Sequence, residues 1–241
     1  MQPQLVVPGV YALSIGGFVN AFLLVADDVT LIDTGTPGHA DEILAAVRRL
    51  GHAPEAIKRI LVTHCLADHT GSLAALQRAT GAPAYMHPLD AALVRQGHAS
   101  RGFTAAPGPL HPVMAPLLGL MSRRVRTIEP AVVAHEVADG DVLPIAGGLR
   151  VIHAPGHCAG QVAFLWPEQG GVLFAADAAA NMLGRLGYPP VGEDWDLVRS
   201  SLKKLAALDF NTAVFGHGGA LVGGAAARFR AKWGLRWRRM L

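Results

Sequence analysis

The chain has 241 residues, half of them hydrophobic, and this length suits one α/β domain with a substantial core. No segment approaches the ~20 uninterrupted apolar residues of a membrane span, and the first residues lack the features of a signal peptide. The two cysteines are too few for a disulfide scaffold. We therefore expect a cytoplasmic, single-domain protein over residues 1–241.

The net charge of +3 has a local origin. Six of the last fourteen residues are Lys or Arg, and without them the chain is mildly acidic. This tail also carries Phe229, Trp233 and Trp237, so it either contacts an anionic membrane or a nucleic acid, or forms an amphipathic terminal helix with packed aromatic rings. The helix is the favoured interpretation. We expect no nucleic-acid and no membrane partner, and the sequence gives no indication of oligomeric state.

The first half of the chain changes from short β-rich runs to alternating helices and strands. Three strands form a meander, which an amphipathic helix follows. The predicted strands are Val10–Ile15, Val19–Val25, Val29–Asp33, Arg59–Thr63 and Pro83–His87, and the predicted helices are His39–Leu50, Ser72–Ala79 and one from about Leu89.

Residues 97–130 break this rhythm with many Gly and Pro residues around an apolar patch, Val113–Met121, and a basic run, Arg123–Arg126. Long irregular segments in compact domains are often functional. The segment is therefore either a cap inserted over a site, where it would suit an acyl or aromatic substrate, or a surface excursion with its own small core. The sequence favours neither.

The second half repeats the theme of strands followed by a helix. Its predicted strands are Val132–Val137, Leu149–His153, Val162–Trp166, Val172–Ala176 and Thr212–Phe215, with a helix at Trp195–Leu208. Two strand-rich halves, each followed by helices, predict sheets packed face to face with helices outside.

Polar residues with the chemistry of metal ligands follow several of these strands. Taken singly each signal is weak, because a His near Gly is often a turn residue and an Asp before a helix is often a cap. Residues at strand ends converge on one sheet edge, however, and imidazole and carboxylate are the ligands expected for zinc, iron or manganese. The residues are His64, Asp68 and His69 after ILVT, His157 in HAPGHCAG, Asp177 in VLFAAD and His217 in AVFGHGG, with Asp33 in LIDTG at another strand end.

The order of these residues resembles the metallo-β-lactamase superfamily over about residues 10–220. The family pattern is an Asp at a strand end, H-x-H-x-D-H, a His in a P-G-H turn, an Asp after a strand and a final G-H. The resemblance implies the αββα sandwich, which the strand pattern predicts independently. It also implies two metal positions that share Asp177: a first with His64, residue 66 and His157, and a second with Asp68, His69 and His217. Asp33 would support the site without binding metal.

The chain departs from this pattern at one position, where Leu66 replaces the second histidine of the motif. Leucine has no lone pair, so the first position keeps three ligands while the second keeps all of its own. We expect one firmly bound Zn²⁺ at the second position and a weakened first position. A thiolate from Cys65 or Cys158 could replace the lost ligand, but neighbours of a ligand in extended chain usually point the other way.

The resemblance implies a metallo-hydrolase with a small-molecule substrate, in which a metal-bound hydroxide attacks an ester, lactone, thioester or related carbonyl. Asp68 would receive the proton, and His64 and His157 would assist as catalytic groups. Asp177 stands where the zinc β-lactamases of the family carry Cys or Ser, so a true β-lactamase is not expected. Ala180 stands where the quorum-quenching lactonases carry Tyr, and nearby Tyr188 is a candidate replacement or a packing residue.

Two alternatives remain open from the sequence. His64, His157 and Asp177 match the two-histidine, one-carboxylate set of non-haem Fe(II) oxygenases, which the persulfide dioxygenases of the superfamily use. Against this, the ligands of the second position are all present. The other alternative is a degenerate metal-binding member that lost its activity at Leu66.

Overall fold

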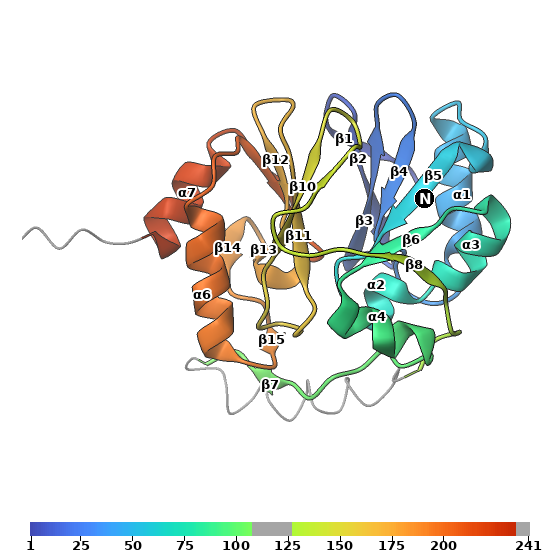
Figure 1. The fold of residues 1–241 in the computed structure, drawn as a ribbon. Coiled ribbons are helices and arrows are strands. Elements are labelled where there is room, and N and C mark those ends of the chain that lie inside the picture. The colour runs from blue at the N-terminus through green and yellow to red at the C-terminus, as the bar shows by residue number, and fades with distance from the viewer. Residues whose placement is uncertain (108–126, 235–241) are drawn as a thin grey trace, which may run out of the picture.

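The computed structural model describes residues 1–107 and 127–234. In these ranges the chain forms two large sheets that pack face to face, with α1, α3 and α4 outside one sheet and α6 and α7 outside the other (Figure 1). The predicted αββα sandwich is confirmed. Among the described helices, none is long and apolar enough to cross a membrane.

The first sheet has seven strands in the order β1-β2-β3-β4-β5-β6-β8. Strands β1 to β4 are antiparallel neighbours, whereas β4, β5, β6 and β8 run parallel. The strands are β1 Gln4–Val7, β2 Val10–Ile15, β3 Val19–Val25, β4 Val29–Ile32, β5 Ile57–Leu61, β6 Ala84–Met86 and β8 Val133–Glu136. Its helices are α1 Ala40–Arg49, η1 Pro54–Ala56, α2 Ala67–Thr70, α3 Leu73–Thr80 and α4 Pro88–Arg95.

The second sheet has six strands in the order β17-β16-β12-β11-β10-β9, of which only β12 and β16 pair in parallel. They are β9 Val142–Leu143, β10 Leu149–His153, β11 Val162–Trp166, β12 Val172–Phe174, β16 Thr212–Val214 and β17 Leu221–Val222. The helices are η2 Ala176–Ala178, α6 Trp195–Ala206 and α7 Ala225–Trp233. Two small pairs complete the described chain: β13 Ala180–Met182 with β14 Arg185–Gly187, and β7 Thr104–Ala105 with β15 Val191–Gly192.

Three apolar clusters hold these layers together. One lies between the sheets, where Phe22 and Phe174 meet edge to face at 5.7 Å between ring centroids. The others lie between each sheet and its helices, with Val47 on one side and Leu202 on the other. Because both faces of the central strands are covered, β4 is buried at every residue, which explains its continuous apolar run.

Most predicted strands and helices agree with the structure to within one or two residues. The sequence did not reveal β1, the short β9 and β17, or the two small pairs. The predicted strand Val172–Ala176 ends at Phe174, because the chain turns into η2 with a positive φ of 49° at Ala176. The predicted terminal helix is present as α7, with Phe229 and Trp233 buried. Trp237 and most of the predicted cap at 97–130, including its apolar patch, lie outside the described residues.

Candidate metal centre

All six predicted ligands come together at one edge of the sandwich, where the two sheets meet. His64 lies just beyond β5, and Asp68 and His69 lie on α2. From the second sheet, His157 lies in the turn between β10 and β11, Asp177 lies after β12, and His217 lies after β16. The prediction that residues after these strands converge therefore describes the geometry correctly.

Asp177 occupies the middle of the cluster. Its Oδ2 atom is 3.2 Å from Nε2 of His217 and 3.7 Å from Nε2 of His157, and its Oδ1 atom is 3.7 Å from Nε2 of His69. Asp68 lies on the other side of His217, with Oδ2 at 3.3 Å from the same Nε2 atom. The His64 ring lies between those of His69 and His157, with centroids 4.0 and 4.9 Å away. Asp177 is thus placed to bridge two positions.

Each imidazole is oriented by a hydrogen bond from its Nδ1 atom. His157 donates to the carbonyl of Val191 at 2.9 Å, and His217 donates to the carbonyl of Phe18 at 2.7 Å. The Oγ1 atom of Thr63 donates to Asp33, so it accepts from Nδ1 of His64 at 2.9 Å. These partners fix the tautomer, and the Nε2 atom of each neutral ring therefore keeps its lone pair for a ligand.

Asp33 supports the centre from behind. Its Oδ2 atom accepts from Nδ1 of His69 at 2.9 Å and from the Thr63 hydroxyl at 2.8 Å, while its Oδ1 atom accepts from the Thr63 amide at 2.8 Å. Both oxygens are therefore engaged away from the cluster. This geometry matches the supporting role expected for Asp33.

The inward-facing atoms themselves lack partners. Nε2 of His64, His69 and His157 and Oδ1 of Asp177 are buried and have no hydrogen-bond partner among the described residues. Unpaired buried polar atoms are costly and rare in folded proteins. Two groups of donor atoms lie within 4.8 Å of one another, His64 with His69 and Asp177, and Asp68 with His69 and His217. The types of these donor atoms, and the lack of hydrogen-bond partners at four of them, fit a metal ion.

The charges of the metal-free cluster also compensate one another. Burial alone would lower the pKa of His217, but Asp177 and Asp68 raise it to about 11, and Asp68, Asp33 and Asp177 similarly raise the pKa of His69 to about 9. Burial would raise the pKa of Asp177, but His217 and His69 hold it well below the usual range. In His64, burial and the neighbouring histidines lower the pKa. Without metal, protons on His69 and His217 therefore neutralise the carboxylates.

Leu66 initiates α2 and keeps the backbone of the motif in place. Its carbonyl accepts from the amides of His69 and Thr70, both at 2.9 Å. Its side chain is half-buried and packs against the apolar cluster between the first sheet and its helices. Leucine at this position therefore leaves intact the turn that presents Asp68 and His69.

The cysteines beside the histidines are both buried. Contrary to the expectation that these neighbours point away, Sγ of Cys158 lies within 4.8 Å of a ring nitrogen of both His64 and His157. Burial and the adjacent Cys65 raise the pKa of the Cys158 thiol, which disfavours the thiolate that binds zinc. Cys158 is near the first position, but its environment suits a neutral thiol.

Two phenyl rings flank the cluster. Phe18 stacks on His217 with 6.3 Å between centroids, and Phe103 stacks on His157 at 5.5 Å. Tyr188 instead packs against Trp195 and Trp233, at 6.4 and 6.0 Å, which supports a packing role.

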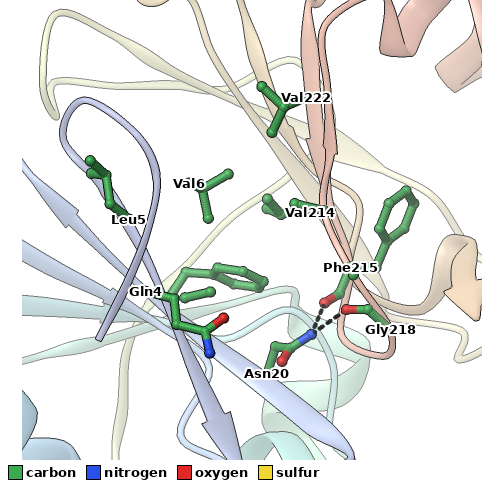
Figure 2. Close-up of a pocket in the computed structure, with 12 residues that line it drawn as sticks. Gln4, Leu5, Val6, Asn20, Val214, Phe215, Gly218 and Val222 are labelled. Atoms are coloured by element: carbon green, nitrogen blue, oxygen red, sulfur yellow. Dashed lines mark hydrogen bonds between the residues drawn. The ribbon is translucent and has the colours of Figure 1, made fainter. Parts of the chain in front are cut away.

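The loop that carries His217 is anchored from the opposite sheet. The side-chain amide of Asn20 on β3 donates to the carbonyls of Phe215 and Gly218, at 3.0 and 2.9 Å (Figure 2). Asn20 also borders a pocket of about 200 Å³ between β1 and β16–β17. The pocket is lined by Gln4, Leu5, Val6, Ala12, Asn20, Phe22, Val214, Phe215, Gly218, Gly219, Ala220 and Val222. None of these lining side chains is titratable.

Several supporting groups were missed by sequence reasoning. The carbonyls of Phe18 and Val191 orient two histidines, yet every residue has a carbonyl, so no residue type marks them. Thr63 was placed in a strand, although a hydroxyl next to a candidate ligand was an available signal. Asp90, which accepts hydrogen bonds from the amides of Cys65 and Gly160, resembled an ordinary acidic residue at the start of a helix.

Comparisons with known proteins identify the family to which this fold belongs. A family model described as the metallo-beta-lactamase superfamily matches residues 14–217. A hydroxyacylglutathione hydrolase of Rhodospirillum rubrum is 32% identical over 184 residues, which cover 75% of this chain and 55% of that protein. An uncharacterized protein of Aquifex aeolicus is 31% identical over 193 residues, covering 79% of this chain and 78% of that one.

A solved structure shows the same fold at lower identity. The subclass B3 metallo-β-lactamase of Bradyrhizobium japonicum gives a TM-score of 0.67 at 21% identity, and the match covers 96% of this chain and 81% of that one. The family model spans most of the chain, and the fold of the solved structure agrees with it. The chain therefore belongs to the metallo-β-lactamase superfamily.

Proposed function

We propose that the protein is a zinc-dependent hydrolase that cleaves an ester, lactone, thioester or related carbonyl compound. The observation that carries this proposal is the set of buried, unpartnered atoms at the cluster: Nε2 of three histidines and Oδ1 of Asp177. Their Nδ1 atoms are already engaged, so these faces are preorganised for a cation. Membership of the superfamily supports the same class of chemistry.

The spacing of the donors suits zinc best at the second position. Tetrahedral ligands with bonds of about 2.0–2.1 Å lie about 3.4 Å from one another. Oδ2 of Asp68 lies 3.8 and 3.3 Å from Nε2 of His69 and His217, and Asp177 lies 3.7 Å from His69 through Oδ1 and 3.2 Å from His217 through Oδ2. The first position has only His64, His157 and the shared Asp177. We infer one firmly held zinc at the second position and a weaker first position.

Bound zinc would acidify a water molecule and polarise the substrate carbonyl. Asp68 is the carboxylate of the cluster with the greater exposure, at 27% of its side chain. Burial would raise its pKa, but His69 and His217 lower it, so Asp68 is ionised at neutral pH and suited to accept the proton of the attacking water. His64 has a lowered pKa, which suits a metal ligand better than a hydrogen-bond donor to an anion.

The comparisons guide the choice of substrates. One relative is named hydroxyacylglutathione hydrolase, so acylated thiols lead the proposed panel, followed by lactones and aryl esters. A β-lactam is the negative control, because Asp177 stands where the zinc β-lactamases of the family carry Cys or Ser. Phe18 and Phe103 beside the outer histidines favour substrates with an apolar acyl group.

The test combines metal analysis with the substrate panel, using protein purified without added metal. We expect about one zinc per chain after dialysis, and loss of both zinc and turnover in Asp177→Asn and His217→Ala. The matched control is Asp209→Asn, which alters an exposed carboxylate paired with Arg230. Retention of zinc and activity in Asp177→Asn would overturn the assignment.

A second candidate is a mononuclear iron enzyme at the first position, favoured by the convergence of His64, His157 and Asp177. In that case the purified protein would contain iron and consume oxygen in the presence of a thiol substrate. His217→Ala, which removes a donor of the second position and none of the first, would then leave iron binding and activity largely intact. Loss of activity in this variant would favour the zinc hydrolase.

A further inference from the structure

A second buried carboxylate lies behind the metal centre. Asp90, in the first turn of α4, has no exposed surface. Its Oδ2 atom accepts from the backbone amide of Cys65 at 2.8 Å, and its Oδ1 atom accepts from that of Gly160 at 2.9 Å. Cys65 directly follows His64, and Gly160 lies three residues after His157. One side chain therefore connects the loops that carry the two imidazoles of the first metal position.

The approach of Asp90 to the second loop depends on a missing side chain. A Cβ atom at residue 160 would lie 2.4 Å from Oδ1 of Asp90, far inside van der Waals contact. Glycine at this position lets the amide reach the carboxylate. The two loops come from different sheets, so their separation is set across the interface between the halves of the sandwich.

Arg101 balances the charge of this carboxylate. Its Nη2 atom donates to Oδ1 of Asp90 and, at 2.9 Å, to the carbonyl of Leu89. Its Nη1 atom reaches Glu193 at 3.4 Å. The amide of Glu193 donates to the carbonyls of Gly156 and His157, so the network continues into the same turn. A buried carboxylate with a cation and two amides is fully engaged.

We propose that Asp90 is a positioning residue that sets the separation of His64 and His157 and so maintains the first metal position despite the leucine at position 66. The inference rests on the proposed metal centre. The two imidazoles lie 4.9 Å apart between centroids and share no hydrogen bond. The histidines of the second position are oriented by other groups, Asp33 and the carbonyl of Phe18. Asp90 should therefore affect the first position selectively.

The same cluster is not a good metal site itself. Carboxylate oxygen of Asp90 and the sulfurs of Cys65 and Cys158 lie within 4.8 Å of one another. Both oxygens already accept hydrogen bonds, however, and the adjacent guanidinium repels a cation. The geometry instead shows Asp90 holding together the loops that carry His64 and His157.

Three variants separate positioning from general stability. Asp90→Asn keeps the size of the side chain but removes the charge and one of the two acceptors. Asp90→Asn combined with Arg101→Gln restores neutrality without restoring the second acceptor. The matched control is Glu136→Gln, which breaks an exposed ion pair with Arg95 on the same helix.

The main measurement titrates zinc into each metal-free protein in competition with a chromophoric chelator. In Asp90→Asn we expect the weaker equivalent to lose about tenfold in affinity while the tighter one is unchanged. The charge-balanced double variant should regain melting temperature but not this affinity. The control should match the wild type. Equal weakening of both equivalents, or no change in either, would overturn the proposal.

A second measurement does not depend on metal. In the metal-free protein, the imidazole nitrogen-15 resonances of His64 and His157 should change in Asp90→Asn, while those of His69 and His217 remain. Unchanged resonances for His64 and His157 would also refute the positioning role. A wild-type protein that binds no zinc would refute the proposed function instead, and the resonances would then decide the role of Asp90 alone.

Discussion

The orientation of each clustered histidine ring is set by the atom that its Nδ1 nitrogen contacts. Because Nδ1 donates to a fixed acceptor, the Nε2 atom of each ring faces inward before any ligand arrives. At residue 66 the side chain instead faces an apolar cluster. In the proposed centre, the two metal positions thus differ by one donor.

Leu66→His should restore this donor. We expect the variant to retain two zinc ions after dialysis where the wild type retains one, measured by elemental analysis. Without metal its free energy of unfolding should fall by about 1 kcal/mol, because a half-buried apolar side chain is lost. Leu66→Asn is the control, since an amide carries a similar polarity but is a poor zinc ligand. If Leu66→His still retains one zinc, residue 66 is not what weakens the first position. A large gain of hydrolytic activity in Leu66→His would favour the alternative that the protein is a degenerate member that lost its activity at this residue.

Side-chain chemistry explains which residues the sequence could identify. His64, His217 and Asp33 are weak signals singly, and they could be identified because their order along the chain, each after a predicted strand, resembles a family pattern. Asp90 could not be distinguished, because an acidic residue in the first turn of a helix has the ordinary explanation of the helix dipole. Its hydrogen bonds to Cys65 and Gly160 depend on tertiary contacts between two sheets, which one sequence does not encode locally.

At the scale of elements, the strands that the sequence predicted well are those buried on both faces or regularly alternating. The pairs β13–β14 and β7–β15 were missed because these strands are two or three residues long and, unlike the equally short β12, are not apolar runs. The early end of β12 was missed because Ala176 carries no sign of its positive φ. That turn places Asp177 between His69, His157 and His217.

The end of β16 must approach the same carboxylate closely. A Cβ atom at residue 216 would lie 2.1 Å from Oδ1 of Asp177 and 2.7 Å from Cε1 of His69. Gly216→Ala should therefore displace the carboxylate, abolish zinc retention and lower the free energy of unfolding by about 1–3 kcal/mol. Gly219→Ala, on the same loop, is the control, because a Cβ there meets nothing within 4 Å. Metal analysis and denaturant unfolding of both variants decide the matter. Full zinc retention in Gly216→Ala would show that the carboxylate has room to move.

At the scale of the whole molecule, the centre joins the two halves of the sandwich. His64, Asp68 and His69 follow β5 of the first sheet, and His157, Asp177 and His217 follow strands of the second. Backbone and side-chain contacts cross the same interface, including Asn20 with the His217 loop and Asp90 with Gly160. Stability and metal binding should therefore be coupled, because any cation at the centre links both sheets.

Without metal, protons on His69 and His217 balance the charges of the nearby carboxylates. The stability of the metal-free protein should therefore depend on pH. The folded-state pKa values of His69 and His217, about 9 and about 11, exceed the unfolded value of 6.5. The stability that each contributes is fully present below pH 6.5 and is lost as the pH rises through the folded value, at most about 1.4 kcal/mol per pH unit for each retained proton. Chelator-treated protein should therefore become less stable from pH 6.5 to 9 in urea unfolding.

Zinc should remove this decline, because the ion replaces the protons on the same two rings and balances the same carboxylates. The comparison is between chelator-treated and zinc-loaded protein at pH 6.5, 7.5 and 9, with metal-free His69→Gln as the control that lacks the titrating ring. We expect a shallower decline in the control and none attributable to the centre in the loaded protein. A metal-free protein whose stability is constant or rises over this range would show that His69 and His217 are neutral, and that the carboxylates of Asp68 and Asp177 are balanced in another way.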